Sequence, residues 1–145
     1  MKKDFFTKPF QLKIEKPWGY EIILTPPEPS VTGKIEHVNA GCRCSLQYHD
    51  KKQETLILIT GKAIIYLEDD RGNLREIEME PRKGYFIKPF QKHRFKGITD
   101  CDIFEASTKE EGNTIRLEDD YSRPTETEEI RKLPNRGWTA HGQKK

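Results

Sequence analysis

Four polar side chains between positions 47 and 93 have the residue types and the spacing of a metal site. Gln47 and His49 lie two positions apart, so in an extended strand their side chains project from the same face. Glu54 follows across a polar, turn-like segment, and a hairpin there would bring it beside them. His93 lies downstream in GYFIKPFQKHRF. Because two imidazoles, a carboxylate and an amide oxygen can bind a divalent ion of borderline hardness, the sequence predicts a metal site.

Short β-strands have to position these residues. Apolar and charged residues alternate in LREIEM, and β-branched runs end at turn residues such as those of residues 68–73. Strands are expected over residues 21–25, 33–39, 62–67, 74–79, 85–87 and 101–106, with a hairpin carrying Glu54 among them. Strands and turns that recur every eight to twelve residues, without helices between them, predict an all-β sandwich or barrel.

One helix is expected near the C-terminus. Thr125 is followed three residues later by Glu128, which is the pattern of a capping box. It predicts a short helix from about Glu126 to Leu133, ended by Pro134. We expect residues 1–145 to form a single domain, with a core over about 16–123, an N-terminal arm over 1–13 and the helix and tail over 124–145.

The composition excludes several classes of protein. The net charge is +2, and no basic run with interleaved aromatics indicates nucleic-acid binding. No segment is apolar enough for a membrane span or a signal peptide. Cys42, Cys44 and Cys101 follow no disulfide spacing, so we interpret them as reduced thiols rather than zinc ligands and expect a cytoplasmic protein. Phe5, Phe6 and Phe10 in the arm are expected to pack on the barrel or on a second subunit, and His141 is expected to be a solvent residue.

The motifs resemble those of a known family. The spacing is Gly41…Gln47-x-His49-x4-Glu54-x6-Gly61, followed by Gly84-x4-Pro89-x3-His93. It resembles the two cupin motifs, and a Gln in the first ligand position is typical of the type II mannose-6-phosphate isomerase cupins. Two further segments resemble that branch, Lys16-Pro17-Trp18-Gly19 and Ile115-Arg116-Leu117-Glu118-Asp119-Asp120-Tyr121-Ser122-Arg123. The resemblance covers roughly residues 16–123.

The resemblance implies a cupin double-stranded β-helix, also called a jelly-roll barrel, with one divalent metal ion. Zinc is the first expectation, and manganese, nickel, cobalt and iron stay open. The implied reaction converts mannose 6-phosphate to fructose 6-phosphate, in which charge builds on enediolate oxygens that a metal can stabilise. The expected substrate-binding residues are Arg43, Arg116 and Arg123, and the expected catalytic residues are Glu118, Asp119 and Lys88, which is also a candidate cation for the phosphate.

Several departures from the family pattern leave alternatives open. The loop after His49 lacks the usual basic residues, Thr55 and Leu56 replace His-Trp, and Ser122 replaces Gly. No nucleotidyltransferase domain is recognised, so a stand-alone isomerase cupin is expected, as a homodimer. The alternatives are a non-catalytic sugar-binding cupin and another metal cupin enzyme, such as a small-molecule dioxygenase. Arg116 and Arg123 could also form a structural strap that closes the barrel.

Overall fold

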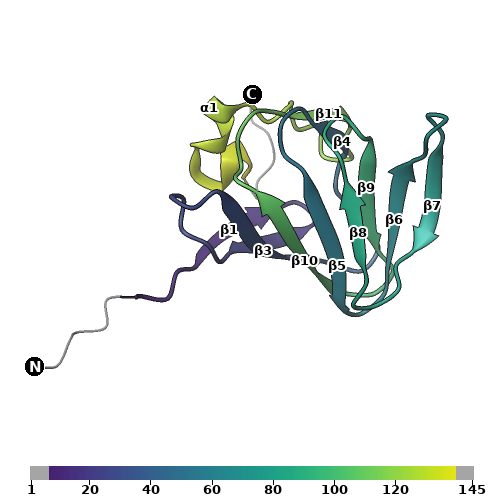
Figure 1. Cartoon of the computed structure of the whole chain (residues 1–145), viewed down its shortest axis with the longest axis horizontal. Helices are drawn as coiled ribbons and strands as arrows, with labels where there is room; N and C mark the ends of the chain where they lie inside the picture. Colours follow the sequence, from purple (N-terminus) through teal and green to yellow (C-terminus); the bar gives the residue numbers. More distant parts are fainter. Residues whose placement is uncertain (1–6, 140–145) are drawn as a thin grey trace, which may run out of the picture.

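The computed structural model describes residues 7–139 and folds them into two antiparallel sheets around a shared interior (Figure 1). The strands are β1 (Leu12–Lys16), β2 (Gly19–Ile23), β3 (Val31–Val38), β4 (Leu46–His49), β5 (Glu54–Thr60), β6 (Ala63–Glu68), β7 (Leu74–Glu78), β8 (Gly84–Ile87), β9 (His93–Gly97), β10 (Cys101–Thr108) and β11 (Thr114–Glu118). One sheet has the order β1-β2-β3-β10-β5-β8 and the other β11-β4-β9-β6-β7. This confirms the predicted all-β fold.

The predicted strands are present, with bounds that shift by one or two residues. Two strands at the borders of the expected core were not predicted. Strand β1 pairs with β2 inside what was expected to be an arm and a turn, and β11 forms within the segment that ends at Arg123. Both borders of the core therefore contribute strands to the barrel.

The C-terminal segment covers one end of the barrel, on the side of β1 and β3 in Figure 1. It contains α1 (Glu128–Arg131) and η1 (Pro134–Gly137), and Glu15 N of β1 donates a hydrogen bond to Asn135 Oδ1 at 2.8 Å. The predicted helix is shorter than expected, and its N-cap is Thr127, whose side chain accepts from Ile130 N. Thr125 does not cap the helix because its hydroxyl accepts from Arg116 N.

Only some of the residues in the predictions for the two termini and the cysteines lie within the described part of the chain. Phe5, Phe6 and His141 lie outside the described residues, whereas Phe10 is half-buried and lines a cavity on the barrel. The three cysteines are free, and Cys44 and Cys101 are buried. Within residues 7–139, neither helical element has the length or the apolar content to span a membrane.

The interior of the barrel has two chemically different ends. The apolar end consists of buried side chains that pack against one another: Trp18, Val38, Cys44, Leu56, Leu58, Ala63, Ile65, Met79, Ile87, Phe95, Cys101 and Ile103. An ionic end surrounds a chamber lined by Lys16, Glu21, Lys34, Glu36, Lys52, Glu54, Glu105, Glu110, Arg116, Arg123, Glu126 and Arg136, together with Gln47 and His49. The members of both sets that belong to strands occupy inward positions, because side chains alternate along a strand, whereas others, such as Lys52 and Arg136, lie in connecting segments.

Candidate metal centre

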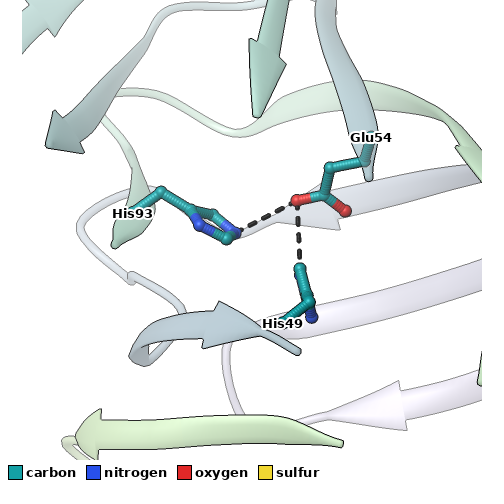
Figure 2. A group of neighbouring side chains, drawn as sticks. All are labelled: His49, Glu54 and His93. Carbon is teal, nitrogen blue, oxygen red and sulfur yellow. Dashed lines mark ion pairs between the residues drawn. The ribbon is translucent and has the colours of Figure 1, made fainter. Parts of the chain in front are cut away.

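Three neighbouring strands position the centre of the ionic end. His49 ends β4 in one sheet and Glu54 begins β5 in the other, so the expected hairpin is wrong: the segment between them crosses from one sheet to the other, and both side chains are buried inside the barrel. Strand β9 pairs with β4 so that His93 lies opposite Gln47. Figure 2 shows the two imidazoles turned toward the Glu54 carboxylate. His49, Glu54 and His93 are all buried, and each offers a ligand atom within 4.8 Å of the other two.

The hydrogen bonds of the imidazoles leave their Nε2 atoms turned toward the carboxylate. His93 Nδ1 lies 2.9 Å from the carbonyl oxygen of Gln91, which can only accept, so Nδ1 carries the proton. His49 Nδ1 contacts Thr114 Oγ1 at 2.9 Å. The Nε2 atoms of His93 and His49 lie 3.1 and 3.5 Å from Glu54 Oε2, yet neither makes a hydrogen bond. Two buried imidazole Nε2 atoms thus face the same carboxylate oxygen without a hydrogen-bond partner.

This donor set fits a divalent cation. Burial, followed by the nearby Lys52 ammonium, lowers the pKa of His49 to about 4, so the imidazole is neutral near pH 7, as a metal ligand must be. Burial alone would raise the pKa of Glu54, but Lys52 and then His49 outweigh it and hold the pKa well below its usual range. Two neutral imidazoles and one carboxylate are a common ligand set for transition metals.

Gln47 lies at the edge of this group. It lines the same chamber as His49 and Glu54, and its Oε1 accepts a hydrogen bond from Ser45 Oγ at 2.5 Å. An amide oxygen has two lone pairs, so this bond leaves one of them for a cation. The structure therefore brings His49, Glu54 and His93 together, and Gln47 lines the chamber beside His49 and Glu54, oriented by the Ser45 hydroxyl.

The ionic network next to the centre was missed by sequence reasoning. Lys52 Nζ lies 3.3 Å from Glu54 Oε1 and 2.9 Å from Glu105 Oε2. Lys34 Nζ lies 2.8 Å from Glu110 Oε2 and 3.3 Å from Glu21 Oε1. Lys52 had been interpreted as part of a polar turn, and the other residues received no role. Together with the contact of Lys34 with Glu105 at 3.9 Å, these ion pairs connect Glu54, a candidate metal ligand, to β10, β3 and β2 of the same sheet.

The other predicted site residues separate into two groups. Arg116, Arg123 and Asp119 lie at the chamber: both arginines line it, and Asp119 holds Arg123 through two hydrogen bonds of 2.9 Å. Arg43, Lys88 and Glu118 do not line the chamber.

Each residue of the second group faces outward for a local reason. Arg43 precedes β4, so the strand alternation that begins at Leu46 does not set its direction, and its guanidinium binds Asp120 through two bonds of 2.8 Å. Lys88 is exposed beyond the end of β8. Glu118 has a largely exposed side chain that contacts Arg94 at 3.2 Å.

Comparison with known proteins supports the fold at low sequence identity. No protein-family model matches the chain, and no curated protein matches it by sequence. Among solved structures, it is similar to an oxalate decarboxylase of Lactobacillus farciminis in complex with formate, with a TM-score of 0.66 and 16% identity over 80% of this chain and 38% of that one. It is also similar to KdgF from Halomonas sp., with a TM-score of 0.56 and 14% identity over 66% of this chain and 83% of that one.

A third similar structure is the capsular polysaccharide assembling protein CapF of Staphylococcus aureus, with a TM-score of 0.58 and 15% identity. The match covers 83% of this chain but only 32% of CapF, so the chain spans about a third of that protein. Together with the two facing sheets and the His-Glu-His group, these similarities define the fold as that of the cupins, as the sequence predicted.

Proposed function

We propose that the protein is a metal-dependent cupin enzyme that isomerises an aldose phosphate to a ketose phosphate, with mannose 6-phosphate and fructose 6-phosphate as the pair implied by the motifs. The observation that carries this proposal is the convergence of two unpartnered Nε2 atoms on Glu54 inside a buried ionic chamber. His49, Glu54 and His93 would hold the ion, with Gln47 as a fourth, uncharged ligand. When bound, a divalent metal supplies a Lewis acid that favours negative charge on the sugar oxygens.

Lys52 controls the charge of the centre. Its ammonium lies within 3.3 Å of both Glu54 and Glu105, so it partly neutralises the carboxylate that binds the ion. A ligand set whose negative charge is reduced in this way leaves a bound cation more electrophilic. We therefore assign Lys52 a positioning role, which holds Glu54 in its ionised form.

The same chamber offers a proton acceptor. Isomerisation requires a base that removes a carbon-bound proton and returns it to the neighbouring carbon. Burial, followed by the charge of Glu54, raises the pKa of Glu105 to about 7, so near neutral pH this carboxyl can both accept and release a proton. Glu105 lines the chamber, unlike Glu118, and it is not locked by an arginine, unlike Asp119. We propose Glu105 as the general base.

Metal analysis and an isomerase assay test the proposal together. We expect about one ion per chain and chelator-sensitive conversion of mannose 6-phosphate to fructose 6-phosphate. His93→Ala should weaken metal binding by at least about 100-fold, because losing a ligand exceeds the effect of losing an outer partner. Glu105→Gln should keep the metal and lose turnover, whereas the outward-facing Glu118→Gln should keep both. Metal without turnover of any aldose or aldose phosphate would sink the isomerase proposal.

A second candidate rests on the size of the chamber. The metal chamber has a volume of about 40 Å³, enough for an ion and roughly one water but not for a hexose. An enzyme that acts on a small acid would need less rearrangement, and one of the similar structures is an oxalate decarboxylase. Loss of a small organic acid in the presence of bound metal, with sugars untouched, would favour this candidate. The homodimer and the cytoplasmic location stay predictions.

A further inference from the structure

A second, larger cavity lies between the C-terminal segment and the barrel. Its volume is about 210 Å³. Four cationic side chains line it, and no carboxylate of the described residues does. The four are Lys16, Arg116, Arg123 and Arg136. The apolar side chains of Leu133 and Trp138 complete the lining. A cavity with cations on one wall and apolar side chains on the other fits a small organic anion.

The carboxylates that pair with these cations lie on the side of the metal chamber. Arg136 contacts Glu110 Oε1 at 2.7 Å and Glu126 Oε2 at 3.1 Å, and both carboxylates line the chamber but not the larger cavity. The four cations line both spaces, so they form a shared wall. An anion in the larger cavity would therefore contact cations that already pair with carboxylates.

Cations and carboxylates are equal in number at this end of the barrel. Seven cations of the ion-pair network contact six carboxylates within 4.0 Å, and Glu36 is a seventh buried carboxylate in the lining of the chamber. The cations are Lys16, Lys34, Lys52, Arg116, Arg123, Arg131 and Arg136, and the carboxylates are Glu21, Glu54, Glu105, Glu110, Asp119 and Glu126. A divalent cation bound at Glu54 would give this end of the barrel an excess of positive charge.

One of these cations, Arg116, has a buried donor atom without a hydrogen-bond acceptor. The side chain of Arg116 is only 9% exposed, and its Nε atom has no hydrogen-bond partner. Its Nη1 atom donates to the Pro124 carbonyl oxygen at 2.7 Å, which adds no negative charge. A buried guanidinium donor left without an acceptor is costly, and an anionic ligand would satisfy it.

We propose that this cavity binds the phosphate group of a phosphorylated small molecule, with the four cations as its ligands and with Leu133 and Trp138 against the carbon part. The inference goes beyond the proposed function, because the shared wall of cations lies between this cavity and the metal chamber; it adds Lys16 and Arg136 to the expected Arg116 and Arg123. Arginine forks suit phosphate because they donate two parallel hydrogen bonds to its oxygens.

The C-terminal segment contributes part of the lining of this cavity. Asn135 and Arg136 have φ values of 47° and 53°, in the left-handed region that non-glycine residues seldom occupy. The ion pairs of Arg136 with Glu110 and Glu126 hold this strained turn against the barrel. A phosphate on the guanidinium of Arg136 would compete with those pairs, so ligand binding and the position of the segment are coupled.

Calorimetric titration of the full-length protein with inorganic phosphate, acetate, mannose 6-phosphate and mannose tests the inference. We expect both phosphates to bind and acetate and mannose to bind at least tenfold more weakly. Leu133→Asp places a carboxylate in the lining at a side chain that is 51% exposed, so folding should be retained. It should weaken phosphate binding about tenfold or more relative to Leu133→Asn, its uncharged match.

Two further variants check the location. Arg136→Gln should weaken phosphate binding about tenfold or more, whereas Arg43→Gln, whose side chain does not line the cavity, should not. Phosphate should also change the tryptophan fluorescence of the wild type, and Trp138→Phe should remove that change although Trp18 stays in place.

The outcomes separate this inference from the proposed function. If phosphate does not bind, or binds equally to the Leu133→Asp and Leu133→Asn variants, the inference is overturned, even if the enzyme isomerises free sugars. Phosphate binding that needs Arg136 supports it even if no metal or turnover is found.

Discussion

The two ends of the barrel interior are made by the same strands and differ in what they bury. Along β10, the inward side chains change from Cys101 and Ile103 to Glu105. Along β5, which pairs with it, they change from Leu58 to Glu54. The backbone alternation is the same throughout, so the difference is carried by side-chain chemistry alone.

The apolar end supplies the buried surface that stabilises the fold, whereas the ionic end is not needed for stability. Burial of apolar surface contributes roughly 25 cal/mol per Å². The attraction within a buried ion pair offsets little more than the free energy that its desolvation costs. Well-packed apolar residues of similar volume are often as stabilising or more so. Because one end holds a dense set of buried charges around convergent metal ligands, we infer that this end is kept for binding and chemistry.

The largest expected effect comes from removing one carboxylate that several cations share. Glu126 contacts Arg116, Arg131 and Arg136 at 3.5, 3.0 and 3.1 Å. Glu126→Gln leaves buried guanidinium groups without their counter-charge, so we expect the free energy of unfolding in urea to fall by about 3–5 kcal/mol. Glu80→Gln is the control, since its pair with Lys83 is exposed and should contribute less than about 1 kcal/mol. Similar losses in both variants would contradict a tightly coupled ionic end.

A similar loss of stability is expected at the apolar end, but without an effect on the site. Leu58 is fully buried in the apolar end. Leu58→Ala should lower the free energy of unfolding by about 2–5 kcal/mol, because the substitution leaves a cavity in a close-packed core. The affinity for metal should stay within about twofold of the wild type. Ile59→Ala, at a side chain that is 48% exposed, should change stability by less than about 0.5 kcal/mol. Loss of metal binding in Leu58→Ala would show that the two ends are not independent.

The candidate metal ligands were predictable because their spacing is local. Gln47 and His49 share one face of β4 through the period of two, and Glu54 follows after a short connection, although that connection joins the two sheets and is not the hairpin that the sequence predicted. His93 required a long-range strand pairing, and the resemblance to cupin motifs supplied it. The fold followed from the regular recurrence of short strands and turns.

The ionic network was missed because alternation shows which residues share a face but not which face is inside. Lys34 and Glu36 have the same parity as Val38 along β3, and all three are buried. That shared parity with an apolar residue was the available indication, but charged positions are normally expected in solvent. Lys52 and Arg136 lie outside the strands, so their direction depends on tertiary contacts that no periodicity encodes.

The smallest expected effect, and the one most specific to the ionic end, is a change in how stability depends on pH. Burial alone would raise the pKa of Glu21, but Lys16 and then Lys34 outweigh it and lower the pKa to about 2. Below its ordinary pKa of 4.5 the unfolded chain therefore binds a proton that the folded chain does not, so stability is lost as the pH falls toward 2.

Glu21→Gln should remove the part of the pH dependence of the unfolding free energy that this carboxyl causes. The difference in unfolding free energy between the wild type and this variant is expected to shrink by about 1–3 kcal/mol as the pH is lowered from about 5 to 2. Leu58→Ala is the matched control, since removing a methyl-rich side chain creates no proton linkage and its difference from the wild type should stay constant with pH. Urea unfolding at several pH values measures both. A constant difference for Glu21→Gln would mean that Glu21 titrates in the folded protein as it does in the unfolded chain, and that its ion pairs do not distinguish the ionic end from the rest of the molecule.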